Sequence, residues 1–568
     1  MKKIKFDPVQ KYLWFFELSL GIILFVILSS LFELRYENND DLIISGLLDG
    51  SFLGRSQWWI FNYVHVVLTY PLYLLYRFAP QTSWYGAWQI LTRFLTFFLP
   101  FHALTSRSRK WSVYLSVTLT WVMLFLSSLR MQIHVQYTST AELAAFMGFV
   151  CFVFHENRKK ATLSFLILEI AAYVTRPNGM KLILPLGASL FLFFSLKKED
   201  WKDSIKKVFI GISLCLTILV AGELIAKLVV WTNKDLQASL SFNRDRTQLF
   251  DYQGFPPYEE VKDVLETHQI SKAKYEALSK YVLLGWKDME DATSELAALS
   301  TQNHNLLYIP EILHQIGKLT LYTTSGRMSL MLLTAWLTAL FSLLFSKKYC
   351  YGLVIIAYHF AKLVSWGYLC YYGRMPRWVT FPLLFIETII AVFIFLRILF
   401  DHQEEREPWN FFQRLSCFGC ISAIVLFSSI GMITQYHATS AKKESILRFE
   451  SEYAQMESFC NARPENIYVA SHLFYDPRQV LLLETNHKKN NNFIYSGGWF
   501  SLLPDFWRNE SDYLTQGKNC YFVISSSAYP DFFEKQLLCL KEYFGTAELQ
   551  KESIPFSGGG TLDVYRLR

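Results

Sequence analysis

Cysteine is scarce in this chain and follows no pattern. The 568 residues hold nine scattered cysteines. Cys417 and Cys420 form a C-x-x-C inside an apolar run, with no second pair to complete a zinc or redox site. We therefore interpret both as small buried residues. Cys460, Cys520 and Cys539 lie in the C-terminal part, which lacks a disulfide framework of the secreted type, so no bridge is predicted.

Internal repeats, low-complexity tracts and basic stripes interleaved with aromatic residues are also missing. The last absence argues against nucleic-acid binding, and the net charge of +7 fits contact with anionic lipid better. The run Gly558–Gly560 lies between predicted strands with no helix after it, so it predicts a hairpin turn rather than a phosphate loop. No small-residue cleavage site follows the first apolar run, which predicts an uncleaved signal anchor.

Apolar sequence in long blocks is what the chain has in excess. Hydrophobic residues make up 52% of it, aromatic residues 17%, and the mean hydropathy is +0.20. This is too apolar for a soluble protein of this size, and a run of about 20 apolar residues spans a bilayer once. The pattern predicts an α-helical polytopic membrane protein of about 11–13 spans or half-spans, near residues 13–32, 61–79, 84–104, 111–129, 138–154, 162–176, 179–196, 208–231, 328–346, 350–371, 378–399 and 411–435.

Basic clusters set the predicted orientation. They lie at residues 2–5, 197–207 and 347–348, and the positive-inside rule places all three in the cytoplasm. Twelve full crossings cannot join an inside N-terminus to an outside C-terminus. At least one candidate must therefore be a half-span, a re-entrant hairpin or a surface helix, and the pair around 175–179 is one suspect. The segments predicted outside are 33–60, 232–326 and the tail from 436.

The tail predicts a small extracytoplasmic α/β domain. Asn466–Ala470 and Cys520–Ile524 have the pattern of buried strands, Phe532–Phe544 that of an amphipathic helix, and Thr561–Arg566 that of a last strand. We therefore divide the chain into a transmembrane domain, 1–435, and this domain, 436–568. The outer segment 232–326 is predicted to be mostly helical.

Two adjacent carboxylates, Asp40 and Asp41, follow the first span and lie near the predicted outer headgroups. A carboxylate there can take a proton from a sugar hydroxyl or hold a divalent cation. An ordinary polar loop is the competing interpretation, because Asn and Asp are common loop residues. No other residue pattern in the chain requires a cofactor.

Arginines form two further candidate sites. Arg374 and Arg377 join two spans on the same predicted side as Asp40, and two arginines can clamp a phosphate. Snorkelling of interfacial arginines is the alternative, although the positive-inside rule disfavours it on an outer loop. Arg244 and Arg246, with their acidic neighbours, are predicted either to touch a phosphosugar or to form a solvated salt-bridge network.

Ionisable residues within predicted spans are functional candidates by default. Glu223 and Lys227 are four residues apart on one helix face, which predicts that they pair with each other. Lys362, Glu387 and Glu142 have no local partner in the sequence. Pairs between helices and water-filled cavities are both open for these three.

Together, these features resemble the GT-C superfamily of integral membrane glycosyltransferases. The likeness lies in an acidic pair in the first outer loop, many spans, a long outer loop after the middle spans and an outer C-terminal α/β domain. Four short runs look like those of bacterial members of the group: Asn39–Gly46, Gln136–Thr140, Thr175–Gly179 and Gly373–Arg377.

The resemblance implies transfer of a sugar, with inversion, from a polyprenyl phosphate or pyrophosphate to a cell-surface glycan, lipid or protein at the bacterial plasma membrane. It implies Asp40 or Asp41 as catalytic base, or as metal ligand where one is used, and Arg374 and Arg377 as phosphate ligands. Many relatives have Arg-Tyr where this chain has Arg-Met-Pro-Arg. Two alternatives are a lipid-linked oligosaccharide flippase, with key charges at the bilayer midplane, and a non-catalytic assembly factor.

Overall fold

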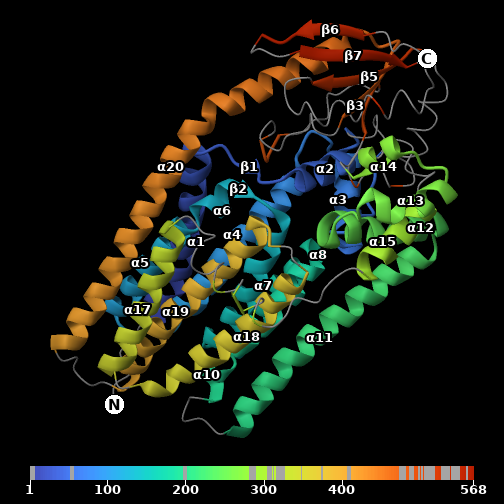
Figure 1. Cartoon of the computed structure of the whole chain (residues 1–568). Helices are drawn as coiled ribbons and strands as arrows, with labels where there is room; N and C mark the ends of the chain where they lie inside the picture. Colours follow the sequence, from blue (N-terminus) through green and yellow to red (C-terminus); the bar gives the residue numbers. More distant parts are fainter. Residues whose placement is uncertain are drawn as a thin grey trace.

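A computed structural model of the chain shows a bundle of long helices with a small β-sheet beyond one end (Figure 1). It describes residues 7–51, 57–195, 201–279, 290–302, 310, 313–314, 317, 326–346, 348–372, 375–405, 411–471, 481–484, 492–496, 499, 503, 519–525, 538, 551–557 and 561–567. Six helices in this part are long and apolar enough to cross a membrane. The predicted fold class, a polytopic helical protein with a small C-terminal sheet region, is confirmed.

Each of the predicted spans coincides with a helix. The helices of the bundle are α1 (Asp7–Leu31), α2 (Asn39–Asp49), α3 (Val66–Phe78), α4 (Trp84–Thr105), α5 (Trp111–Ser127), α6 (Leu129–Ile133), α7 (Tyr137–Phe154), α8 (Arg158–Thr175), α9 (Pro177–Ser189), α10 (Leu192–Ser195), α11 (Trp201–Trp231), α17 (Gly326–Ser346), α18 (Gly352–Tyr371), α19 (Arg377–Glu405) and α20 (Phe411–Asn461). Between α11 and α17 lie α12 (Lys234–Thr247), the π-helical turn η1 (Gln248–Gln253), α13 (Tyr258–Thr267), α14 (Lys272–Leu278) and α15 (Glu290–Gln302).

Polar contacts between helices identify the two ends of the bundle. At one end, His102 of α4 lies 2.7 Å from Glu17 of α1, and the backbone N–H of Arg109 donates to Gln403 of α19 at 2.7 Å. At the other end, α2, α4 and the start of α7 meet beneath the C-terminal sheet (Figure 1). We call the latter the sheet end.

Helix α3 is the candidate span that does not run from one end of the bundle to the other. Its 13 residues are about 20 Å long, which is shorter than the ~30 Å hydrocarbon core of a bilayer. Both of its termini lie at the sheet end: the N–H of His65 donates to the carbonyl of Val174, and the indole N–H of Trp84, the first residue of α4, donates to that of Ala79. The suspected pair around 175–179 is instead the turn between α8 and α9.

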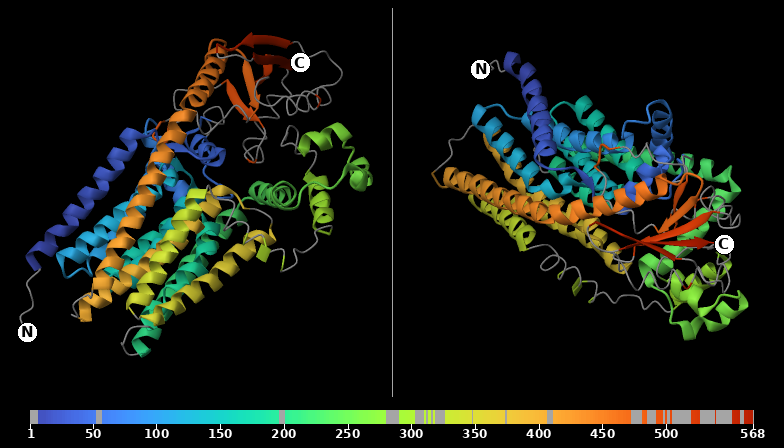
Figure 2. Two further views of the ribbon diagram at one scale, coloured as in Figure 1. Left: turned by 60° about the vertical axis from the view of Figure 1, so that its left-hand side comes forward. Right: turned by 90° about the horizontal axis from the view of Figure 1, so that it is seen from above.

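With α3 set aside, the described helices that run between the two ends are α1, α4, α5, α7, α8, α9 with α10, α11, α17, α18, α19 and α20. Their number is odd, so the chain starts at one end and finishes at the other. The left view of Figure 2 agrees, since the start of α1 and the sheet lie at opposite ends of the bundle.

The C-terminal sheet contains five strands in the order β4-β3-β5-β7-β6, where β3 is parallel to β4 and β5, and β7 is antiparallel to β5 and β6. The bounds are β3 (Ile467–Ser471), β4 (Phe493–Ser496), β5 (Cys520–Ser525), β6 (Lys551–Pro555) and β7 (Thr561–Leu567). The three predicted strands are present. The predicted helix at 532–544 and the turn at 558–560 fall outside the described residues, apart from position 538. The predicted domain boundary lies within α20, which is continuous from the bundle into the sheet region.

Backbone contacts fasten the C-terminal region to the bundle. The N–H of Leu482 donates to the carbonyl of Leu34 at 2.8 Å, and the Ser83 hydroxyl donates to the carbonyl of Leu482 at 2.8 Å. Arg35 lies in β1 (Arg35–Tyr36), which pairs in parallel with β2 (His134–Val135). The same Arg35 forms an ion pair of 2.7 Å with Glu450 of α20.

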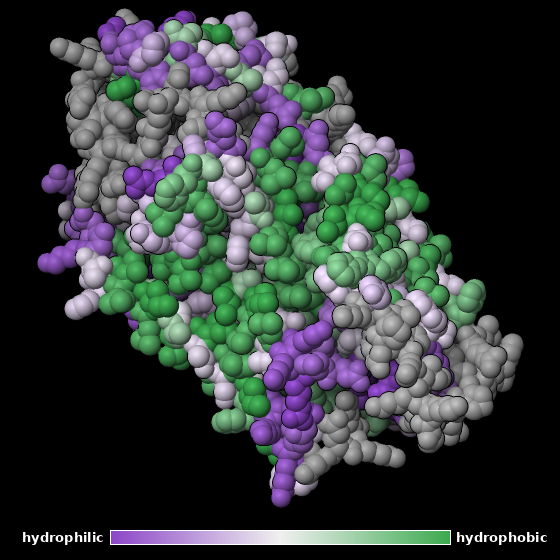
Figure 3. Space-filling model, turned by 180° about the vertical axis from the view of Figure 1, so that it is seen from behind, coloured by the Kyte–Doolittle hydropathy of each residue, from purple (hydrophilic) through white to green (hydrophobic). Residues whose placement is uncertain are grey.

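Apolar side chains cover the middle of the rear face of the molecule, and polar ones gather toward its upper and lower ends (Figure 3). Helix α11 illustrates this pattern, since Phe209, Leu216, Val220 and Leu224 are all more than half exposed. Large exposed apolar side chains at regular helical positions are typical of a surface that contacts lipid.

Gly86, in the first turn of α4, tests the docking of the C-terminal region. A Cβ atom at this position would lie 2.0 Å from the carbonyl oxygen of Leu482. We expect Gly86→Ala to push this segment away, to lower the stability by about 1–3 kcal/mol and to speed proteolysis of the C-terminal region. Gly367→Ala in α18 is the control, because a Cβ there meets nothing within 4 Å. Wild-type melting and proteolysis of Gly86→Ala would contradict the contact.

Candidate active site

A cavity of about 750 Å³ opens at the sheet end of the bundle. Its walls come from α2, α7, α9, α12, η1, α18 and α19 and from Trp499 of the C-terminal region. Its charged lining residues are Asp40, Glu142, Asp251, Arg176, Lys181 and Arg246. Its aromatic lining residues are Tyr63, Tyr137, Tyr252, Tyr368, Tyr372, Trp378 and Trp499. The cavity thus combines acidic and basic side chains with the flat faces of aromatic rings.

The two acidic residues of the first loop differ in position. Asn38 caps α2, so Asp40 and Asp41 both lie in the first helical turn and point in different directions. Asp40 is half-buried and lines the cavity, and its Oδ1 accepts a hydrogen bond of 2.9 Å from the indole N–H of Trp499. Asp40 is therefore the member of the pair that can meet a bound molecule.

Asp41 faces the helix bundle instead. Its carboxylate is fully buried and accepts hydrogen bonds from the Tyr85 hydroxyl at 2.8 Å and from the backbone N–H of Tyr137 at 3.1 Å. Burial raises the pKa of the Asp41 carboxyl, while the donors Tyr85 and Tyr137 act in the opposite direction. Asp41 thereby joins α2 to α4 and to the N-terminus of α7.

Arg176 forms a positive corner of the cavity. It has an extended backbone, as expected before proline, and Pro177 begins α9. The guanidinium lies 4.8 Å from the ring centre of Tyr63 and 5.2 Å from that of Tyr137. The N-terminus of α9 adds its own positive potential beside this side chain, so the corner favours an anion.

The four predicted arginines have different positions. Arg246 is buried, lines the cavity, donates to the Tyr63 hydroxyl at 3.2 Å and lies 3.7 Å from Asp251. Arg244 is exposed, pairs with its neighbour Asp245 and does not line the cavity. Arg377 is exposed at the start of α19, beside the lining residue Trp378. Arg374 lies outside the described residues.

The charged residues within the predicted spans have different partners. Lys362 of α18 and Glu387 of α19 form a buried ion pair of 2.6 Å, which matches the expectation of a pair between helices. Glu223 does not follow the predicted pairing with Lys227, because its carboxylate lies 2.6 Å from Lys181 of α9. The neighbouring helix offers Glu223 a closer ammonium than its own helix does.

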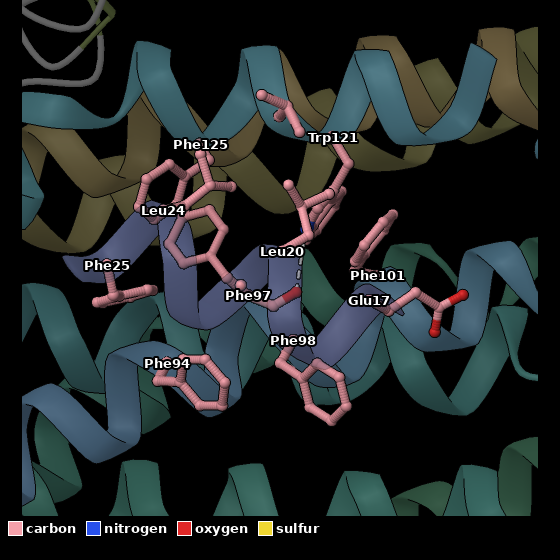
Figure 4. A pocket seen from close by; sticks show the side chains of 12 residues that line it. Glu17, Leu20, Leu24, Phe25, Phe94, Phe97, Phe98, Phe101, Trp121 and Phe125 are labelled. Carbon is pink, nitrogen blue, oxygen red and sulfur yellow. Dashed lines mark hydrogen bonds between the residues drawn. The ribbon is translucent and has the colours of Figure 1, made fainter. Parts of the chain in front are cut away.

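A second hollow, between α1, α4 and α5, is not a substrate site. It holds about 20 Å³, enough for roughly one water molecule. Figure 4 shows that mainly aromatic side chains fill its walls, including Phe97 and Trp121. Its charged residue, Glu17, already contacts His102. Among the described residues there is also no group of three or more His, Cys, Asp or Glu side chains placed to hold a metal.

Sequence reasoning did not assign a role to Arg176, Tyr63 or Trp499. Arg176 could have been found, because an Arg-Pro step between two apolar helices places a cation at a helix N-terminus. Nothing in the sequence points to Trp499, which lies 459 positions from Asp40.

Fold and site together define a polytopic helical protein with a charged cavity beneath a C-terminal sheet. No family model and no curated protein matches the sequence. Two solved structures are similar to it. One is the crystal structure of ArnT from Cupriavidus metallidurans bound to undecaprenyl phosphate, with 11% identity, a TM-score of 0.43 and coverage of 97% of both chains. The other is apo ArnT from the same organism, with 10% identity, a TM-score of 0.44 and coverage of 96% of this chain and 97% of that chain.

The different positions of the two carboxylates predict different stabilities. Asp41→Ala leaves the Tyr85 hydroxyl and the Tyr137 N–H buried without an acceptor, which should lower the free energy of unfolding by about 1–3 kcal/mol. Asp40→Ala removes a half-buried group at the cavity wall and should cost less. Thermal melts of both variants in one detergent test this. A larger loss for Asp40→Ala would contradict the assignment.

Proposed function

We propose that this chain is a membrane glycosyltransferase of GT-C type, which moves a sugar from a polyprenyl-phosphate donor to an acceptor hydroxyl at the sheet end. The observation that supports it is one cavity lined by a carboxylate, Asp40, and by the guanidinium groups of Arg176 and Arg246. A base for the acceptor and cations for a phosphate are what this reaction requires.

Access from the bilayer favours a lipid-linked donor. The cavity wall includes Val364 and Tyr368 of α18, which are 52% and 56% exposed on the outside of the bundle. Leu182 and Pro185 of α9 continue this apolar wall. A prenyl chain can therefore lie against α18 and α9 while its phosphate reaches the corner formed by Arg176.

The proposed reaction is a direct displacement at the anomeric carbon. Asp40 takes the proton of the acceptor hydroxyl as its oxygen forms the new bond, and the bond from the sugar to the lipid phosphate breaks. Arg176, Arg246 and the N-terminus of α9 hold the phosphate, which leaves as a stabilised anion. Attack opposite the leaving group inverts the anomeric centre.

Trp499 links the C-terminal region to this chemistry. Its indole N–H donates to Asp40 Oδ1, and its ring packs edge-to-face on Tyr63 at 5.3 Å. The hydrogen bond orients the carboxylate, whose Oδ2 also accepts a hydrogen bond of 3.5 Å from the Asn38 amide. We propose an acceptor-docking role for residues 436–568 on this basis.

We also propose that the sheet end lies outside the cytoplasm. The opposite end carries Arg107, Arg109, Lys110 and the basic run 158–160, and the positive-inside rule places such an end inside. This orientation would present the cavity to cell-surface acceptors.

Cysteine labelling tests the orientation. Glu465 is exposed beside β3 and Lys159 is exposed at the opposite end. In a Cys350→Ser background, which removes an exposed native thiol, an impermeant maleimide should label Glu465→Cys in intact cells. It should label Lys159→Cys only after permeabilisation. The reverse pattern would overturn the orientation.

Transfer assays with a polyprenyl-phosphate sugar test the roles of Asp40 and Arg176. Asp40→Asn should lower the transfer rate by about 10²-fold or more, because the base is lost, and should keep donor binding. Arg176→Ala should weaken donor binding through loss of a phosphate contact. The matched controls are Asp263→Asn on α13 and Arg77→Ala on α3, both exposed and outside the cavity lining.

Two results would count against the proposal. Full transfer by a stably folded Asp40→Asn protein would remove Asp40 from the role of base. Movement of a lipid-linked sugar across the membrane by the wild-type protein, without transfer to any acceptor, would favour the flippase alternative.

A further inference from the structure

Glu142 is a carboxyl group in the cavity wall that has no hydrogen-bond partner among the described residues. It lies on α7, its side chain is 0% exposed, and neither of its oxygens has a hydrogen-bond partner among the described residues. A buried carboxylate without a donor is costly. A molecule bound in the cavity that supplies hydrogen-bond donors to Glu142 would offset this cost.

The position of Glu142 beside Arg176 indicates which kind of molecule can bind in this part of the cavity. A Cβ on Gly179 would lie 3.3 Å from Arg176 Cγ and 3.5 Å from Glu142 Cγ, so the two side chains flank the same glycine in the first turn of α9. The guanidinium of Arg176 is nevertheless directed to Tyr63 and Tyr137. A ligand that reaches both groups carries an anion at one point and hydrogen-bond donors a short distance away.

We propose that Glu142 is the sugar subsite of the cavity and accepts hydrogen bonds from hydroxyl groups of the donor sugar. This inference rests on the proposed function. Carboxyl oxygens accept hydrogen bonds from hydroxyl groups, whereas the phosphate and the prenyl chain of the donor offer no such hydroxyl groups. The sugar is the part of the donor that offers O–H groups next to the phosphate. Two carboxylate oxygens can receive two neighbouring hydroxyls, which makes the subsite selective for their arrangement.

Glu169 of α8 provides a matched control. It is also 0% exposed and both of its oxygens also lack a partner among the described residues. It does not line the cavity, and it packs against Gly148 of α7, where a Cβ would lie 2.7 Å from its Oε1. Glu142→Gln and Glu169→Gln therefore replace the same kind of buried carboxyl group, but only the first replaces one in the cavity wall.

The experiment compares binding of decaprenyl phosphate and of decaprenyl-phosphate-linked glucose, galactose and mannose to the full chain in nanodiscs. We expect wild type to bind at least one sugar-bearing lipid about 10-fold or more tightly than decaprenyl phosphate. Glu142→Gln should lose most of this gain and keep its affinity for decaprenyl phosphate within about 2-fold. Glu169→Gln should keep the gain.

A deoxy analogue of the preferred lipid sharpens the test. Removal of the hydroxyl that Glu142 receives should weaken binding to wild type and have little effect on Glu142→Gln, because the two changes remove the same contact. Without ligand, Glu142→Gln should melt close to the wild-type temperature, since the carboxyl group that it replaces has no hydrogen-bond partner among the described residues.

Three results would overturn the subsite: an unchanged gain in Glu142→Gln, no gain for any of the three sugars in wild type, or a Glu142→Gln protein that melts far below wild type without ligand. Failure of the proposed function looks different, because wild type would then not bind decaprenyl phosphate at all.

Discussion

The carboxylate of Asp41 is the contact on which the arrangement of the site depends. It is fully buried where α2, α4 and α7 meet, and it accepts from the Tyr85 hydroxyl and from the N–H of Tyr137. It thereby gives a hydrogen-bond acceptor to the backbone N–H of Tyr137, which has no partner within helix α7 because it lies in the first turn. Because Asp41 is fixed in this way, the preceding residue of the same helical turn, Asp40, must face the cavity.

Breaks between helices supply the remaining charges of the site. The chain turns from α8 into α9 at Arg176–Pro177, which sets a cation at a helix N-terminus. It turns from α12 into a π-helical segment after Arg246, beside Asp251. Regular spans bury apolar side chains, whereas their termini carry unsatisfied backbone groups and polar residues. Most of the charged residues that line the cavity accordingly lie close to a helix terminus.

The order of helices was predictable because hydropathy is local. The predicted spans at 84–104 and 138–154 needed no knowledge of tertiary contacts, and the predicted strands at 466–470 and 520–524 followed from their apolar pattern. Which of Asp40 and Asp41 faces the cavity was not predictable, since it depends on Tyr85, far along the chain. The predicted pair of Glu223 with Lys227 was wrong for the same reason, because Glu223 pairs with Lys181 of a neighbouring helix and the packing of the two helices decides that choice.

Helix α20 joins the bundle to the C-terminal sheet. Its 51 residues are about 75 Å long, so the helix behaves as a lever whose lower half lies in the bundle and whose upper end holds β3. A few degrees of tilt in the lower half would displace the far end by several ångström. The ion pair of Arg35 with Glu450 and the bond of Trp499 to Asp40 oppose that displacement. Through these two contacts, a change in the tilt of α20 would reach the carboxylate of Asp40.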